Sequence, residues 1–150
     1  MPRLRDTTPV SGSVERTQAE LERFLLSLRG GNGVARLRLR VPMDGIFFGI
    51  SLDRDVRIEA HRTRDAENLN DVIRIAWTPE GTMVFPSFEG TLIVWSEGDP
   101  NLSYIELDGS YKPPLGTAGQ VFDATIGQSI AHATAREFLK DLKAAIESAP

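Results

Sequence analysis

The last third of the sequence places one strand directly before one long helix, and this order constrains the fold more than any other feature. Residues 102–111 read as a strand, and the Lys-Pro-Pro-Leu-Gly segment 112–116 then forms a hinge. Residues 117–148 carry apolar side chains at helical spacing and read as one amphipathic helix. A single long helix after a run of strands predicts a curved antiparallel sheet that grips the helix, often with an apolar cavity beneath it.

The residues before this segment predict further strands and one helix. Residues 14–29 have the apolar spacing of a helix, which ends at a cluster of glycines. Residues 44–53 fit a short helix or a buried strand, and the pattern does not decide between them. Strand-like patterns occur over residues 34–41, 56–61, 72–77 and 88–95. The predicted fold class is therefore α+β, with an antiparallel sheet, a long C-terminal helix and an added N-terminal helix.

Length and composition bound the remaining possibilities. The 150 residues fit a single domain, which we place at 14–150, after a disordered arm at 1–13 that lacks any periodicity. The net charge of -4 provides no overall attraction to nucleic acid. No run of about 18 apolar residues is present, so we expect no integral membrane association and a cytoplasmic protein. The absence of cysteine excludes disulfides and thiolate metal sites.

The predicted C-terminal helix carries two different apolar faces. One stripe, which begins in the first half, carries Phe122, Ile126, Ile130, Ala133 and Thr134. In the second half the apolar residues lie on a face rotated by more than a quarter turn: Ala131, Ala135, Phe138, Leu139, Leu142 and Ile146. A helix that winds over a curved sheet would bury both faces. Ordinary core packing and the roof of a cavity explain the pattern equally well.

Several short motifs resemble those of a known superfamily. They are Trp77-Thr-Pro, Phe85-Pro-Ser-Phe-Glu-Gly90, Leu107-Asp-Gly-Ser-Tyr111 and Pro113-Pro-Leu-Gly116, followed by Phe122-Asp and an alanine-rich helix. Residues 34–147 thereby resemble uncharacterised members of the START-like, or SRPBCC, superfamily, and the Gly109–Gly116 junction is the most specific part. The resemblance implies a helix-grip fold with a hydrophobic pocket between sheet and helix. It also implies two short helices after the first strand, where only 44–53 is available.

Signals for catalysis are weak. His61 and His132 lie on the polar sides of their predicted elements, and Asp123 suits the first turn of a helix. Glu106 and Asp108 share a strand face that we expect to meet water. Two histidines and no cysteine match no zinc spacing, and we predict no metal, no cofactor and no catalytic residues.

The first functional hypothesis is a module that binds a small hydrophobic or lipid-like molecule between the sheet and the C-terminal helix. The predicted ligand-binding residues are Ile75, Trp77, Phe88, Leu92, Ile105, Leu107, Phe122, Ile126 and Ile130. A cyclase- or dehydratase-like enzyme in the same pocket is the second hypothesis, and it needs inward polar groups such as Arg74 or Tyr111 to converge on one ligand. The third is an interaction protein with a filled core, in which Ile93 and Trp95 form a homodimer face.

Overall fold

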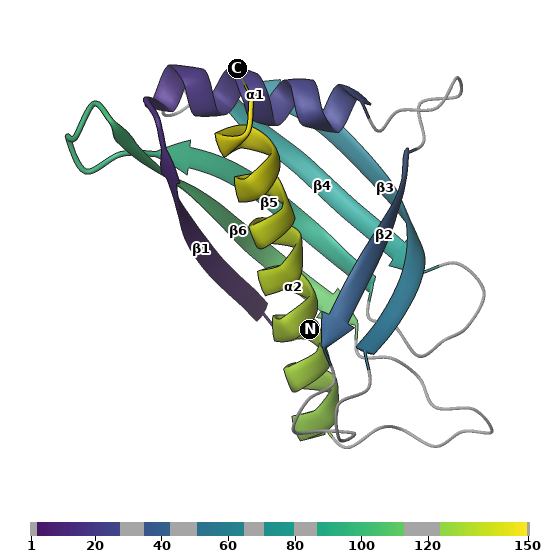
Figure 1. The fold of residues 1–150 in the computed structure, drawn as a ribbon. Helices are drawn as coiled ribbons and strands as arrows, with labels where there is room; N and C mark the ends of the chain where they lie inside the picture. Colours follow the sequence, from purple (N-terminus) through teal and green to yellow (C-terminus); the bar gives the residue numbers. More distant parts are fainter. Residues whose placement is uncertain are drawn as a thin grey trace.

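The computed structural model describes residues 3–27, 35–42, 51–64, 71–79, 87–112 and 124–149 (Figure 1). In chain order the elements are β1 (Arg3–Ser11), α1 (Val14–Ser27), β2 (Ala35–Pro42), β3 (Ser51–Arg64), β4 (Asp71–Pro79), β5 (Ser87–Trp95), β6 (Leu102–Lys112) and α2 (Ala124–Glu147). The strands form one sheet in the order β1-β6-β5-β4-β3-β2, and every neighbouring pair is antiparallel. The predicted α+β class, with an antiparallel sheet and a long C-terminal helix, is confirmed.

The sheet curves around α2. The helix contacts both β1 and β2, which are the two edge strands of the sheet. Figure 1 shows α2 running along the hollow side of the sheet, while α1 crosses one end, next to the C-terminus of α2. Helix α1 contacts α2, β5 and β6 at that end. The two helices therefore cover one face and one end of the sheet.

Strand β1 corrects the predicted disordered arm at 1–13. Residues Arg3–Ser11 pair with β6 along the full length of the strand. The sequence pattern concealed this strand because only Leu4 and Val10 are buried, while Asp6 and Thr8 occupy the inward positions between them. Pro9 also weakened the pattern, but proline is tolerated on an edge strand because its missing N–H belongs to no ladder.

The position of β1 also changes how the chain compares with the START-like pattern. The predicted N-terminal helix is confirmed as α1, but it follows the first strand and does not precede it. The resemblance implied two short helices after the first strand, and the described residues contain one helix there, α1. The sequence placed this helix before the first strand because β1 had not been recognised.

The other predicted strands are confirmed. Strands β2 to β6 contain the segments 34–41, 56–61, 72–77, 88–95 and 102–111 to within one residue. Residues 51–53, at the end of the ambiguous segment, begin β3, and residues 44–50 lie outside the described part of the chain. The predicted helix start at Thr117 is also outside the described residues.

The C-terminal half of α2 packs on the inner face of the sheet. The six residues predicted on its buried face are all buried, and Phe138 and Leu142 are completely inaccessible to solvent. They join Leu4 and Val10 of β1 and Leu21 of α1 in one hydrophobic cluster. This confirms the predicted face of the second half. Of the other predicted stripe, Thr134 is buried and Ala133 is half-buried. Phe122 and the side chains of Ile126 and Ile130 are outside what the structure describes.

The last turns of α2 cap the free edge of β1. Lys143 Nζ donates to the carbonyl oxygen of Pro9 at 2.6 Å, and the Ser11 N–H donates to Glu147 Oε1 at 3.0 Å. The hydrogen bond from Ser11, together with nearby Lys143, holds the pKa of Glu147 below its usual range. Unpaired strand edges invite association with other chains, so these contacts close part of an exposed edge.

Candidate ligand site on the inner face of the sheet

Three aromatic residues form a row across the inner face of neighbouring strands. Trp77 of β4 lies opposite Phe88 of β5, and Phe88 lies opposite Tyr111 of β6. All three side chains are buried. Strand alternation sends them to the same face as the other buried residues of these strands, and the register brings them side by side. The three residues lie near the end of β4, the start of β5 and the end of β6. Figure 1 shows these strand ends on the side of the sheet away from α1.

Trp77 is the centre of the aromatic contacts. Its ring stacks on Phe88 with centroids 4.5 Å apart, and the ring of Phe138 from α2 lies at 5.4 Å in a tilted arrangement. Such offset and tilted geometries are the favourable ones for aromatic pairs. The sheet and α2 are therefore joined at this point through three aromatic side chains.

Two glycines lie in the next row of the inner face. Gly90 of β5 is directly opposite Gly109 of β6. A Cβ atom at Gly90 would overlap the carbonyl oxygen of Asp108, and one at Gly109 would overlap that of Glu89. Either would also come within 2.7 Å of Cζ of Phe88, so the phenyl ring covers the glycine pair. Glycine commonly marks places where strands bend or where another group approaches the backbone closely.

Helix α1 closes the other end of the inner face. The hydroxyl groups of Thr17 in α1 and Ser103 in β6 are 2.7 Å apart and buried, and Ser103 Oγ also lies 3.5 Å from the carbonyl oxygen of Val10. Buried polar groups are stable when they are hydrogen-bonded in this way. This end of the interior is thus sealed by satisfied hydrogen bonds.

The structure gathers the predicted site residues of the sheet into one cluster. Ile75, Trp77, Phe88, Leu92, Ile105 and Leu107 are all buried in the hydrophobic core, together with Phe138 and Leu142 of α2. Phe122 and the side chains of Ile126 and Ile130 remain predictions from the sequence. The clustering is also what an ordinary core requires, so it does not by itself distinguish a ligand wall from packing.

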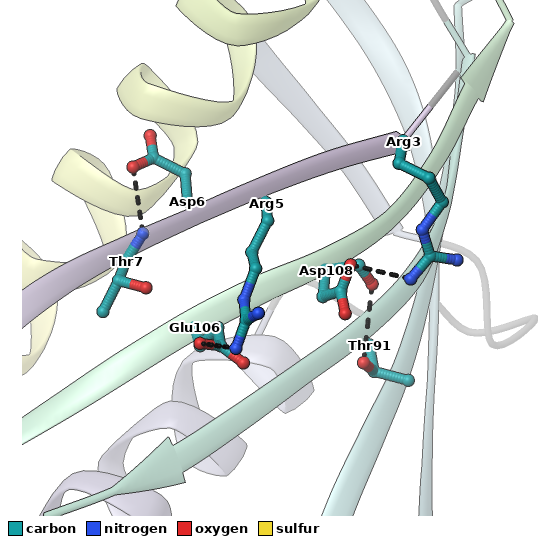
Figure 2. Close-up of polar contacts among 7 residues, drawn as sticks. All are labelled: Arg3, Arg5, Asp6, Thr7, Thr91, Glu106 and Asp108. Carbon is teal, nitrogen blue, oxygen red and sulfur yellow. Dashed lines mark hydrogen bonds and ion pairs between the residues drawn. The ribbon is translucent and has the colours of Figure 1, made fainter.

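The outer face of the same strands is polar, and one expectation about it was wrong. Figure 2 shows Arg3 and Arg5 of β1 reaching Asp108 and Glu106 of β6, each at 2.9 Å, while Asp6 points to the side of α2. Glu106 was expected to meet water, but only 11% of its side chain is exposed. Arg5, which belongs to the unpredicted strand β1, covers it.

Several residues named in the cyclase-like and homodimer hypotheses lie on the outer face. Arg74 is exposed there, so of the two polar groups considered for a cyclase-like site only Tyr111 faces the interior. Trp95 stacks on Tyr104 with centroids 4.5 Å apart, and both are half-buried. Ile93 is likewise half-buried. The outer aromatic pair is therefore already packed within the chain.

The described surface includes two depressions that are lined by charged residues. One of about 590 Å³ is on the outer face, and its charged lining residues are Arg3, Arg74, Glu89 and Asp108. The other, of about 300 Å³, lies between β1 and α2 and includes Asp6, Arg136, Lys140 and Lys143. Both mix charges of opposite sign. Most of the residues that line both are charged or polar, whereas aliphatic and aromatic side chains are typical of a site for a small hydrophobic molecule.

The described part of the chain shows neither a metal-ion site nor a membrane-spanning helix. Among these residues, no group of three or more histidine, cysteine or acidic side chains could hold a metal ion. No helix within the described ranges is long and apolar enough to cross a membrane.

Comparisons with known proteins identify the fold. No protein-family model matches the sequence, and no curated protein matches it. Among solved structures, a conserved protein from Geobacillus kaustophilus is 15% identical with a TM-score of 0.61, over 97% of this chain and 95% of that one. An uncharacterised protein from Bacillus thuringiensis is 16% identical with a TM-score of 0.61, over 97% and 98%.

A third structure carries a functional name. The Zhui aromatase/cyclase from Streptomyces sp. R1128 is 16% identical, with a TM-score of 0.54 over 97% of this chain and 91% of that one. The chain has a START-like fold. At these identities the START-like likeness concerns the fold alone, because one fold can support unrelated functions.

Sequence reasoning missed three features of the START-like interior. Strand β1 was hidden by its polar composition, and the pairing of Gly90 with Gly109 depends on a register that no local pattern specifies. Tyr111 was considered only for the enzymatic alternative, although its spacing of two residues from Gly109 and four from Leu107 puts it on the same strand face. That alternation was the available signal.

Proposed function

We propose that this protein binds a small apolar molecule between the inner face of its sheet and α2, at the end of the sheet opposite α1. The observation that carries the proposal is the aromatic row of Trp77, Phe88 and Tyr111, which meets Phe138 of α2. Ligand sites are mostly apolar and aromatic, with a few polar groups that orient the ligand. The row supplies both kinds of group in one place.

The position of the row follows from how the rest of the interior is filled. Beside α1, the hydrogen-bonded Thr17 and Ser103 and the packed side chains of α2 occupy the inner face. A ligand is therefore proposed nearer the start of α2, where the sequence predicts that Phe122, Ile126 and Ile130 face the sheet. Leu92, Ile105 and Leu107, which the sequence predicted as contacts, are assigned to the supporting core.

Binding is favoured over catalysis. The Zhui protein is named as an aromatase/cyclase, and its fold is similar to this one. An enzyme of that kind would need ionisable groups that converge on its substrate. On the described inner face, the buried polar side chains besides Tyr111 and Trp77 are the hydroxyls of Thr17, Ser103 and Thr134, while Asp6, at an inward position of the edge strand β1, is only half-buried. A container for an apolar molecule agrees better with this lining.

The neutral fluorophore N-phenyl-1-naphthylamine tests the proposal. Its emission should rise on binding to the parent protein, and Ile130→Trp should weaken binding by about tenfold or more if the new ring fills the site. Ile93→Trp is the matched control, because it makes the same change on the outer face and should leave binding intact. Circular dichroism checks that both variants fold.

Two negative results together would contradict the proposal. If the parent protein does not bind the fluorophore, and native mass spectrometry of protein purified from cells finds no retained small molecule, the interior is a filled core. The outer face would then be the place to look for function.

A further inference from the structure

One polar atom in the aromatic row has no partner. Trp77 is 2% exposed, and its indole Nε1 finds no hydrogen-bond acceptor among the described residues. The large majority of buried polar groups in proteins are hydrogen-bonded, so an exception calls for an explanation. The indole N–H can only donate, so the missing partner must be an acceptor.

Packing alone does not explain an indole at this position. The contacts that Trp77 makes with Phe88 and Phe138 are ring contacts, and a phenyl group can make them too. A phenyl group would avoid the free-energy cost of burying a donor without an acceptor. Tryptophan at this position therefore lowers stability relative to phenylalanine unless an acceptor pairs with the indole N–H.

We propose that the indole N–H of Trp77 donates a hydrogen bond to an acceptor oxygen of the bound molecule. This inference rests on the proposed function and narrows its ligand class to apolar molecules that carry a carbonyl or ether oxygen. Trp77 is shielded from bulk solvent, so a molecule that supplies the acceptor must be enclosed in the interior together with the indole. A site that offers a buried donor discriminates against analogues that cannot accept, since they leave the donor unpaired.

A matched pair of probes isolates this hydrogen bond. 2-Acetylnaphthalene carries a ketone oxygen, and 2-isopropylnaphthalene has the same number of heavy atoms without an acceptor. The parent protein should bind the ketone about tenfold more tightly, the difference that one hydrogen bond of ordinary strength produces. The dissociation constants can be measured by displacement of N-phenyl-1-naphthylamine.

The protein offers a matched pair of sites as well. Trp77 and Trp95 are its two tryptophans, and Trp95 lies on the outer face against Tyr104. Replacing either with 3-benzothienylalanine exchanges the indole N–H for sulfur and keeps the bicyclic ring. The ratio of the dissociation constants of the hydrocarbon and the ketone should fall from about ten to about one with the change at Trp77. It should stay near ten with the change at Trp95. Trp77→Phe gives a second variant that needs no synthetic amino acid.

The indole signals report the same bond directly. The two tryptophan side chains give two indole N–H resonances in a proton–nitrogen correlation spectrum, and the two replacements assign them. The ketone should shift the Trp77 resonance downfield, while the hydrocarbon should not.

Two outcomes would overturn the inference and leave the proposed function standing. In the first, both probes bind the parent equally, or the ketone preference survives the change at Trp77. In the second, the benzothienyl change at Trp77 lowers the melting temperature of the free protein, because the N–H would then already have an acceptor such as a buried water. If neither probe binds the parent, the proposed function itself fails.

Discussion

The two faces of β6 are both largely covered, but by different means. On the inner face, Ile105 and Leu107 are buried beneath α2 in an apolar cluster. On the outer face, Arg5 covers Glu106 and the ring of Trp95 stacks on Tyr104. The same strand is thus shielded by hydrophobic packing on one side and by ion pairs and aromatic stacking on the other.

This difference separates what stabilises the fold from what shapes its surface. Burial of apolar side chains scales with the area removed from water and dominates stability. Ion pairs gain little when exposed and more when one partner is shielded, because a charge left unpaired in a shielded place is costly. Substitutions on the inner face should therefore lower the free energy of unfolding more than substitutions on the outer face.

The largest effect is expected at Phe138. Phe138→Ala removes a ring that is completely buried between α2 and Trp77, and it should lower the free energy of unfolding by about 3–5 kcal/mol. His132→Ala, on a more exposed side of the same helix, should stay within about 0.5 kcal/mol. Denaturation midpoints in urea measure both. The reverse order would mean that the faces of α2 are assigned wrongly.

A substitution at Gly109 tests the packing of the inner face without removing any hydrophobic side chain. Gly109→Ala forces a Cβ atom against the carbonyl oxygen of Glu89 and the ring of Phe88, so it should cost about 1–3 kcal/mol. Ser110→Ala, one residue along on the outer face, should change stability by no more than about 0.5 kcal/mol. Thermal unfolding of the two variants is a direct comparison. Equal stability would show that the strands can separate to admit a methyl group.

The two arginines of β1 allow a shielded and a more exposed ion pair of the outer face to be compared. Arg5→Ala uncovers Glu106, whose side chain is 11% exposed, and should cost about 1–2 kcal/mol. Arg3→Ala breaks the pair with the more exposed Asp108 and should cost about 0.5 kcal/mol. A double-mutant cycle with Glu106→Gln separates the pairing energy from lost packing. A coupling energy near zero would show that Arg5 acts only as a cover.

The smallest effect is expected from acidification at the edge of β1. The pKa of Glu147 is lowered mainly by the hydrogen bond from the Ser11 N–H, so the folded protein favours the charged form. The resulting stabilisation is present above the ordinary glutamate pKa of about 4.3 and is lost as the pH falls through the lowered value. Between pH 6 and pH 3 the parent should lose slightly more thermal stability than Glu147→Gln. Identical losses would argue against this contact in solution.

The sequence predicted the strands that alternate apolar and polar residues, and it failed where tertiary contacts replace that pattern. Segments such as 72–77 and 102–111 carry their own periodicity, so their inward residues follow from the order of the amino acids alone. Strand β1 buries only Leu4 and Val10 and depends on partners about a hundred residues away, so its local pattern is weak.

The candidate site could be predicted only in part, for the same reason. Trp77 and Phe88 were identified from alternation, but their stacking and the glycine row beside them depend on register. The unpartnered N–H of Trp77 is a property of its whole surroundings, and no local motif encodes it.

The late pairing of β1 has a consequence for synthesis. Arg5 and Glu106, which form an ion pair, are 101 positions apart, so at about 5–20 residues per second β1 leaves the ribosome roughly 5–20 seconds before its partner strand. A strongly hydrophobic strand waiting that long would be free to pair with neighbouring chains. The arginines, Asp6 and Pro9 oppose such pairing, so the polar composition that conceals β1 from sequence analysis also protects the nascent chain from aggregation.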